Sequence, residues 1–138
     1  MPISGQQKSL YKFCNEYIYL NSVTQGQWYT VADLSGDLCI YFANLFRKDD
    51  DATSKQLSVR ISADGDMDVL SLDFSNDTWY YMYQNVGITE KGIWATVNMV
   101  LFMYYSPLFC SQFKLEVRWD GTVGTNPQLK SSVKYSRR

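Results

Sequence analysis

The sequence predicts an all-β domain, most like an antiparallel β-sandwich of the jelly-roll type with about seven or eight strands. Segments in which apolar and polar residues alternate recur roughly every ten residues. Turn dipeptides such as Ser35-Gly36, Asp64-Gly65 and Asp120-Gly121 separate these segments. Aromatic residues make up 16% of the chain and include eleven tyrosines, and large flat side chains favour pleated sheets.

The N-terminal segment is the one place where the pattern favours a helix. An apolar stripe with helical spacing runs along it, formed by Leu10, Phe13, Cys14, Tyr17 and Ile18. The run from Tyr17 to Leu20 would equally suit the start of a strand. We expect a short helix over Ser9–Leu20.

Two strands are expected next, over residues 27–33 and 37–46, joined by a turn at Ser35-Gly36. The second is apolar on both faces, which suits a central strand. One of its faces would carry Cys39, Tyr41, Ala43 and Leu45, and the other Leu38, Ile40 and Phe42. A polar loop over residues 49–54 follows.

A hairpin is the strongest local prediction. Residues 55–62 alternate, with Leu57, Val59 and Ile61 on one face, and Asp64-Gly65 is a characteristic two-residue hairpin turn. The return strand changes phase after Val69, which predicts a β-bulge. A strand over residues 78–86 and a turn over residues 89–92 complete this part of the chain.

The uncharged run between Lys91 and Lys114 has the length of a membrane helix, which needs about 20 apolar residues. Polar residues and Ser106-Pro107 interrupt it, and proline disfavours a helical residue before it. We therefore expect a buried strand over residues 93–105 and no membrane span. A second strand, from Leu108 to Trp119, alternates strictly and should have one face toward water.

The C-terminal residues predict a basic tail. The 138-residue chain has a net charge of −1, but its last residues carry only bases, Lys130, Lys134, Arg137 and Arg138. Without them nine bases face fourteen acids, a body of −5. We expect a single domain over residues 1–125 and a tail over residues 126–138 that contacts an acidic neighbour. So few bases without a basic body argue against nucleic acid as the partner.

The residue types exclude several kinds of chemistry. The chain has no histidine, so Ser-His-Asp and Cys-His catalysis and the usual zinc sites are ruled out. The three cysteines are far apart in apolar surroundings, which indicates buried free thiols and a reducing compartment. The N-terminus has no apolar signal segment, so secretion by a signal peptide is not expected. Asp64, Asp66 and Asp68 have a spacing that suits calcium, but a hairpin with a wet face explains them better.

An aromatic platform is the best candidate binding feature. It would consist of Trp28, Tyr29, Trp79, Tyr80, Tyr81 and Tyr83. Such a surface stacks on sugar rings or on another subunit, although core packing explains the same residues equally well.

The sequence therefore predicts a protein that is not an enzyme and needs no cofactor. The first hypothesis is a structural subunit of a larger assembly such as a virus or phage particle, in the virion or the host cytoplasm. Its partners would be copies of itself or neighbouring structural proteins. The alternative is a carbohydrate-binding module or lectin that uses the aromatic platform. A small glycosidase-like enzyme is a third hypothesis and would need two carboxylates facing one another in a cleft.

Overall fold

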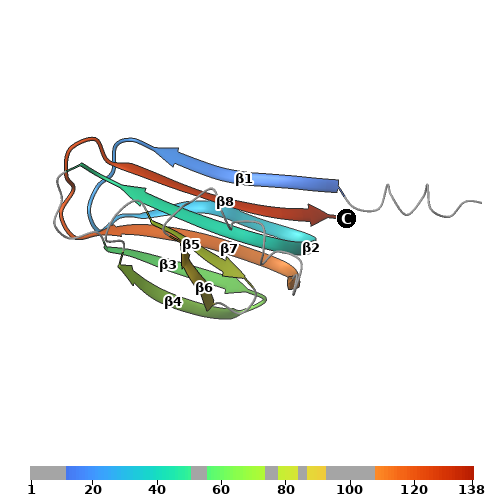
Figure 1. The fold of residues 1–138 in the computed structure, drawn as a ribbon. Helices are drawn as coiled ribbons and strands as arrows, with labels where there is room; N and C mark the ends of the chain where they lie inside the picture. The colour runs from blue at the N-terminus through green and yellow to red at the C-terminus, as the bar shows by residue number, and fades with distance from the viewer. Residues whose placement is uncertain (1–11, 51–55, 74–77, 84–86, 93–107) are drawn as a thin grey trace, which may run out of the picture.

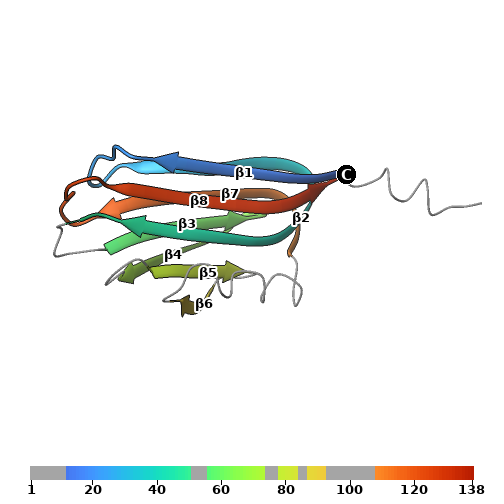
Figure 2. The ribbon, with the colours of Figure 1, turned by 45° about the horizontal axis from the view of Figure 1, so that its top comes forward.

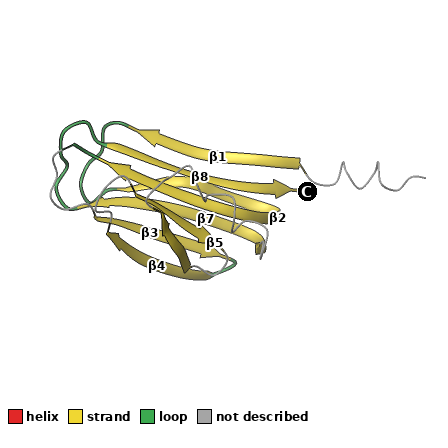
Figure 3. Cartoon of the chain, in the orientation of Figure 1, coloured by secondary structure: helices red, strands yellow, loops and turns green. Residues whose placement is uncertain are grey.

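The computed structural model describes residues 12–50, 56–73, 78–83, 87–92 and 108–138 (Figure 1). All regular structure in these residues is strand, which confirms the all-β class (Figure 3). The strands are β1 (Lys12–Leu20), β2 (Trp28–Lys48), β3 (Gln56–Ala63), β4 (Asp66–Asp73), β5 (Thr78–Tyr83), β6 (Gly87–Gly92), β7 (Leu108–Asp120) and β8 (Gln128–Arg137).

The described strands join into one antiparallel sheet through the long strand β2. The order is β1-β8-β2-β7-β3-β4, with β5 paired to β2 and β6 paired to β5. The first part of β2, from Trp28 to Ile40, pairs with β7, and the part from Leu38 to Lys48 pairs with β8. Two separate sheets, as in the predicted sandwich, are therefore not what these strands form.

Strand β2 turns back on itself. Its 21 residues would span about 70 Å if they were straight. Trp28 at one end nevertheless pairs with Arg118, while Arg47 at the other end lies over the ring of the adjacent residue, Trp119. The bend coincides with a register shift between Ser35 and Leu38, where Gly36 has a φ of +127° that only glycine adopts readily. Figures 1 and 2 show the two halves of β2 running out and back.

The hydrophobic core lies between the parts of the sheet that this fold brings face to face. Its fully buried side chains come from β2, β3, β7 and β8: Leu38, Leu45, Leu57, Val59, Leu115, Val117, Trp119, Leu129 and Val133. Strand β2 has a second register shift between Ile40 and Phe42. This shift moves the core-facing positions from Leu38 and Ile40 to Ala43 and Leu45, so the predicted division of β2 into faces is wrong.

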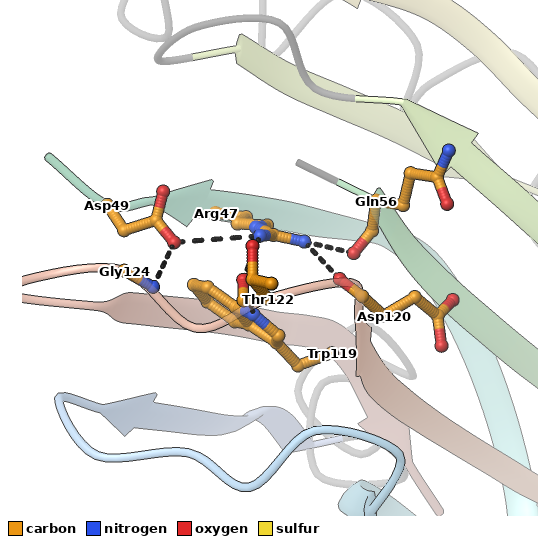
Figure 4. A network of polar contacts seen from close by, with 7 residues as sticks. All are labelled: Arg47, Asp49, Gln56, Trp119, Asp120, Thr122 and Gly124. Atoms are coloured by element: carbon orange, nitrogen blue, oxygen red, sulfur yellow. Dashed lines mark hydrogen bonds and ion pairs between the residues drawn. The ribbon is translucent and has the colours of Figure 1, made fainter. Parts of the chain in front are cut away.

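A buried arginine joins the C-terminal end of β2 to β3, to β7 and to the turn after β7 (Figure 4). The side chain of Arg47 is 0% exposed, and its guanidinium lies 3.8 Å from the ring centroid of Trp119. It donates to the backbone carbonyls of Asp120 at 2.8 Å and Thr122 at 3.3 Å, and also to that of Gln56.

The counter-ion of Arg47 is also buried. Asp49 Oδ2 lies 3.6 Å from the guanidinium and accepts from the Gly124 amide at 3.0 Å. The indole N–H of Trp119 donates to the Thr122 carbonyl at 3.2 Å. One cation therefore connects β2, β3 and the turn after β7, and a charge without water requires such compensation.

Several local predictions are confirmed. Residues 64–65 form the two-residue turn between β3 and β4, with φ of +49° at Asp64 and +91° at Gly65. The alternating segment before Asp120 is β7, and its inward side chains are buried. The buried strand predicted for residues 93–105 lies outside the described residues, as does most of the loop over residues 49–54. Among the residues that are described, no helix has the length and hydropathy needed to cross a bilayer.

Three local predictions are wrong. The expected N-terminal helix is β1, because each of its residues from Lys12 to Leu20 has a partner on β8. The β-bulge predicted after Val69 is absent, because β3 and β4 pair without a register shift. The change of phase in the sequence arises because Met67 and Val69 are apolar but exposed. The expected turn over residues 89–92 belongs to β6, where pairing with β5 overrides its weak strand propensity.

The predicted tail is instead an internal strand. Strand β8 lies between β1 and β2 and pairs along its whole length with both. Leu129 and Val133 are fully buried and Tyr135 is 3% exposed. The alternation of apolar and polar residues that marks a strand is interrupted here by a serine. The inward position between Leu129 and Val133 is Ser131, and its hydroxyl donates to the Asn44 carbonyl at 2.8 Å.

Removal of residues 126–138 should therefore abolish folding, because it exposes one side of both β1 and β2 and opens the core. We expect the shortened chain to show no cooperative thermal transition by circular dichroism. The exposed substitution Lys134→Ala on the same strand should change the free energy of unfolding by no more than about 0.5 kcal/mol. A shortened chain that melts cooperatively near the full-length midpoint would contradict an integral β8.

Candidate functional site

Three of the four most exposed aromatic side chains in the described part of the chain lie on strand β1. Phe13 is 84% exposed, Tyr17 68% and Tyr19 53%. They occupy alternate positions with Asn15, so they share one face of the strand. Cys14, Ile18 and Leu20 on the other face pack against the core. The same alternation on β8 defines the accessible residues that we call the β1–β8 outer face: Phe13, Asn15, Tyr17, Tyr19, Lys130, Ser132 and Lys134.

The β1–β8 outer face combines aromatic and basic groups and has no acid. Lys130 Nζ lies 4.7 Å from the ring centroid of Tyr19 and 5.2 Å from that of Phe46. The ring of Phe13 lies 5.9 Å from that of Tyr41 at an interplanar angle of 35°. Sequence reasoning missed this face, because the expected helix obscured the period-two spacing of Tyr17 and Tyr19.

Strand β1 also ends the order of hydrogen-bonded strands. It pairs with β8 on one side, and no strand within the described ranges pairs with its other side. The backbone N–H and C=O groups on such an edge are a template for another strand. Strand β4 ends the order on the far side, with Met67 64% exposed and Val69 51% exposed.

The residues of the predicted aromatic platform come from two strands, β2 and β5. Trp28 is half-buried on the first part of β2, whereas β5 pairs with the second part. Tyr29 is also half-buried, and its hydroxyl accepts from the Thr24 amide at 2.8 Å. The strand predicted for Trp79, Tyr80, Tyr81 and Tyr83 is present as β5, but their side chains lie outside what the structure describes.

Trp28 belongs to a cluster of ion pairs on β2, β3 and β7. Its ring centroid lies 4.2 Å from the guanidinium carbon of Arg60 and 4.8 Å from that of Arg118. Arg60 donates to both carboxylate oxygens of Glu116 at 2.8 Å, and Arg118 donates to Asp120 at 2.7 Å. Both cations therefore have carboxylate partners, and the cluster links side chains of β2, β3 and β7 across the sheet.

Three of the four bases of the predicted tail contact other groups of the chain, namely Lys130, Arg137 and Arg138. The backbone amide of Arg138 donates to the Asp37 carbonyl at 3.0 Å, and its guanidinium lies 3.4 Å from the Asp37 carboxylate. Arg137 reaches the Ser35 carbonyl at 3.4 Å, so both residues hold the bend of β2. Lys134 is exposed on the β1–β8 outer face.

The three aspartates of the calcium candidate, Asp64, Asp66 and Asp68, have different surroundings. Asp64 Oδ1 accepts from the backbone amides of Ser111 at 2.8 Å and Gln112 at 2.9 Å, which ties the β3–β4 turn to β7. Asp66 and Asp68 are exposed. Within the described ranges, no three His, Cys, Asp or Glu side chains are grouped so that they could hold a metal ion.

All three cysteines are free, and two of them are buried. Burial raises the pKa of Cys110 to about 11, and the nearby Asp64 charge adds to this effect. Burial also raises the pKa of the Cys39 thiol, although hydrogen bonds to Tyr41 and Ser136 oppose it. Neither thiol has the lowered pKa that a reactive cysteine requires at neutral pH.

A polar depression of ≈ 480 Å³ lies at the end of the molecule where β1 and β2 finish and β8 begins. Figure 1 shows these ends gathered on the left of the view. Its lining residues are Tyr19, Asn21, Lys48, Asp50, Asn126, Pro127 and Gln128. Asn126 donates its side-chain amide to Asp50 at 2.8 Å, so a carboxylate and an amide lie side by side.

The ion pair of Glu116 should make stability depend on pH. The hydrogen bonds from Arg60 lower the pKa of Glu116 below its usual 4.5, against the opposing effect of burial. Its contribution is therefore present above about pH 4.5 and is lost as the pH falls through the lower folded-state pKa. Glu116→Gln should reduce the thermal midpoint by roughly 3 to 6 °C at pH 7 and by much less at pH 3. The exposed control Asp68→Asn should leave the thermal midpoint unchanged at both pH values. Equal losses for Glu116→Gln at pH 7 and pH 3 would contradict this role of the ion pair.

Comparison with known proteins identifies no relative of this chain. No protein-family model, no curated protein and no solved structure matches it. Its function must therefore be inferred from the placement and chemistry of its own residues.

Proposed function

We propose that this chain is a non-enzymatic structural subunit that assembles with further copies of itself through strand β1 and the β1–β8 outer face. The observation that carries the proposal is the row of Phe13, Tyr17 and Tyr19 on an edge strand. Large exposed aromatic side chains in one row are typical of protein interfaces, where tyrosine contributes much of the binding energy.

The surface that would receive β1 is the β4 side of a second copy. Asp66 and Asp68 are exposed there and complement the lysines of the β1–β8 outer face. A depression of ≈ 470 Å³ beside the start of β4 is lined by Met67, Phe113 and Asp64, among others. Such a hollow suits an aromatic side chain with a base next to it.

A contact between two different surfaces of the same chain repeats from copy to copy. It closes into a ring or a shell, or continues as a filament, depending on the angle between neighbours. This behaviour suits a particle subunit, and we place the protein in a virus or phage particle or in the host cytoplasm. The free thiols support a reducing compartment.

The arrangement of the sheet in layers is a further part of this proposal. The turned-back strand β2 puts two parts of the sheet face to face around one core, as in a two-layered sandwich. We propose that this arrangement is a jelly-roll-like sandwich.

The association can be measured by light scattering after size-exclusion chromatography over a range of concentrations. We expect the wild-type protein to form oligomers and the double variant Phe13→Ser/Tyr17→Ser to be a monomer. Asp66→Lys/Asp68→Lys should weaken the association from the other side, because it places like charges together.

Phe109→Ser provides a matched control, because Phe109 is 67% exposed but lies on β7 away from β1. It should leave the oligomeric state unchanged. A wild-type protein that remains a monomer at every concentration would overturn the proposal, as would oligomers that survive both the β1 and the β4 substitutions.

A further inference from the structure

Polar side chains form most of the lining of the polar depression at the end of β1. Three carboxamides, Asn21, Asn126 and Gln128, line it together with one base and one acid. Three separate segments supply these groups: the end of β1, the end of β2 and the loop before β8. Their convergence comes from long-range pairing, since Leu20 pairs with Leu129 and Lys48 with Gln128.

Two hydrogen bonds fix the positions of Asp50 and Asn126. The Asp50 amide donates to the Thr125 carbonyl at 2.9 Å, and the Asn126 side chain donates to Asp50 Oδ2 at 2.8 Å. Asn126 has a φ of +53°, a conformation that asparagine tolerates better than most residues. The carboxylate and the carboxamide therefore form a prearranged pair of hydrogen-bonding groups.

An aromatic wall completes the depression. Tyr19 lines it and is 53% exposed, while the Lys130 ammonium lies 4.7 Å from its ring centroid. A tyrosine ring offers an apolar face for C–H groups and a hydroxyl for hydrogen bonding. The volume of ≈ 480 Å³ lies within the range of about 300–1,000 Å³ that is usual for small-molecule sites.

The chemistry of the lining selects among ligand classes. A phosphate or nucleic acid would need an excess of positive charge, whereas Asp50 here balances Lys48. A strongly apolar ligand would need an apolar lining, which amides and charges do not provide. A sugar ring carries several hydroxyl groups and an apolar C–H face. The hydroxyl groups suit the carboxylate and the carboxamides of the lining, and the C–H face suits the ring of Tyr19.

We propose that this depression binds a neutral saccharide, with Asp50, Asn126 and Gln128 hydrogen-bonded to its hydroxyl groups and Tyr19 stacked on its ring. This activity goes beyond self-assembly and uses residues other than the predicted aromatic platform. It gives the subunit a means of attachment to a glycan, and Tyr19 is shared between the depression and the end of the β1–β8 outer face.

Saturation-transfer NMR with named sugars tests the site. The probes are the methyl glycosides of galactose, glucose and mannose, N-acetylglucosamine, and 3′-sialyllactose as the charged member. We expect saturation of at least one neutral probe by the wild-type protein. Asp50→Ala and Gln128→Ala should each weaken its apparent affinity by about tenfold, because each removes a hydrogen bond to the ligand.

Tyr17→Ala is the matched control, because Tyr17 lies on the β1–β8 outer face but not in the depression. It should weaken self-association and leave sugar binding unchanged, whereas Asp50→Ala should do the reverse, so the two proposals fail separately. Near-ultraviolet circular dichroism verifies that each variant is folded. The saccharide site is overturned if no neutral probe is saturated, if only 3′-sialyllactose is, or if both depression variants bind like the wild type.

Discussion

The fold depends on how a single buried cation is compensated. Arg47 has no exposed surface, and its guanidinium is held by backbone carbonyls, the Trp119 ring and the Asp49 carboxylate. Because a buried charge without partners is strongly unfavourable, these groups must come together when the chain folds. They lie just after β2, on β3 and at the end of β7, where Arg118 pairs with Trp28 at the start of β2, so the contact can form only if β2 turns back. Local strand propensity alone would leave that strand extended.

The turned-back strand determines which edges the molecule presents. It places β8 and β1 on one side of β2 and β7, β3 and β4 on the other. The two ends of this order have different chemistry, with aromatic rings and lysines near β1 and aspartates near β4. The proposed assembly follows from this asymmetry, and the proposed saccharide site lies where the ends of β1, β2 and β8 meet. Both proposals therefore rest on the same constraint.

The sequence predicts those parts of the fold that depend on neighbouring residues. The Asp64-Gly65 hairpin and the alternation along β7 are local patterns, and both are confirmed. The spacing around Phe13 and Tyr17 fits a helix and a strand equally, and only pairing with β8 decides between them. The placement of β8 and the partners of Arg47 are set by residues far away in the chain. The candidate binding groups were missed for the same reason, since Asn21, Asp50 and Asn126 converge only in the folded chain.

The free energy of unfolding of Arg47→Met, measured by urea denaturation, tests the central role of this cation most directly. Methionine keeps an unbranched apolar chain but cannot satisfy the carbonyls of Asp120 and Thr122 or the charge of Asp49. Lys134→Met is the matched control, because the Lys134 side chain is exposed on β8. The account predicts a loss of about 3–5 kcal/mol for Arg47→Met and less than about 1 kcal/mol for the control. Equal, small losses in both variants would contradict it.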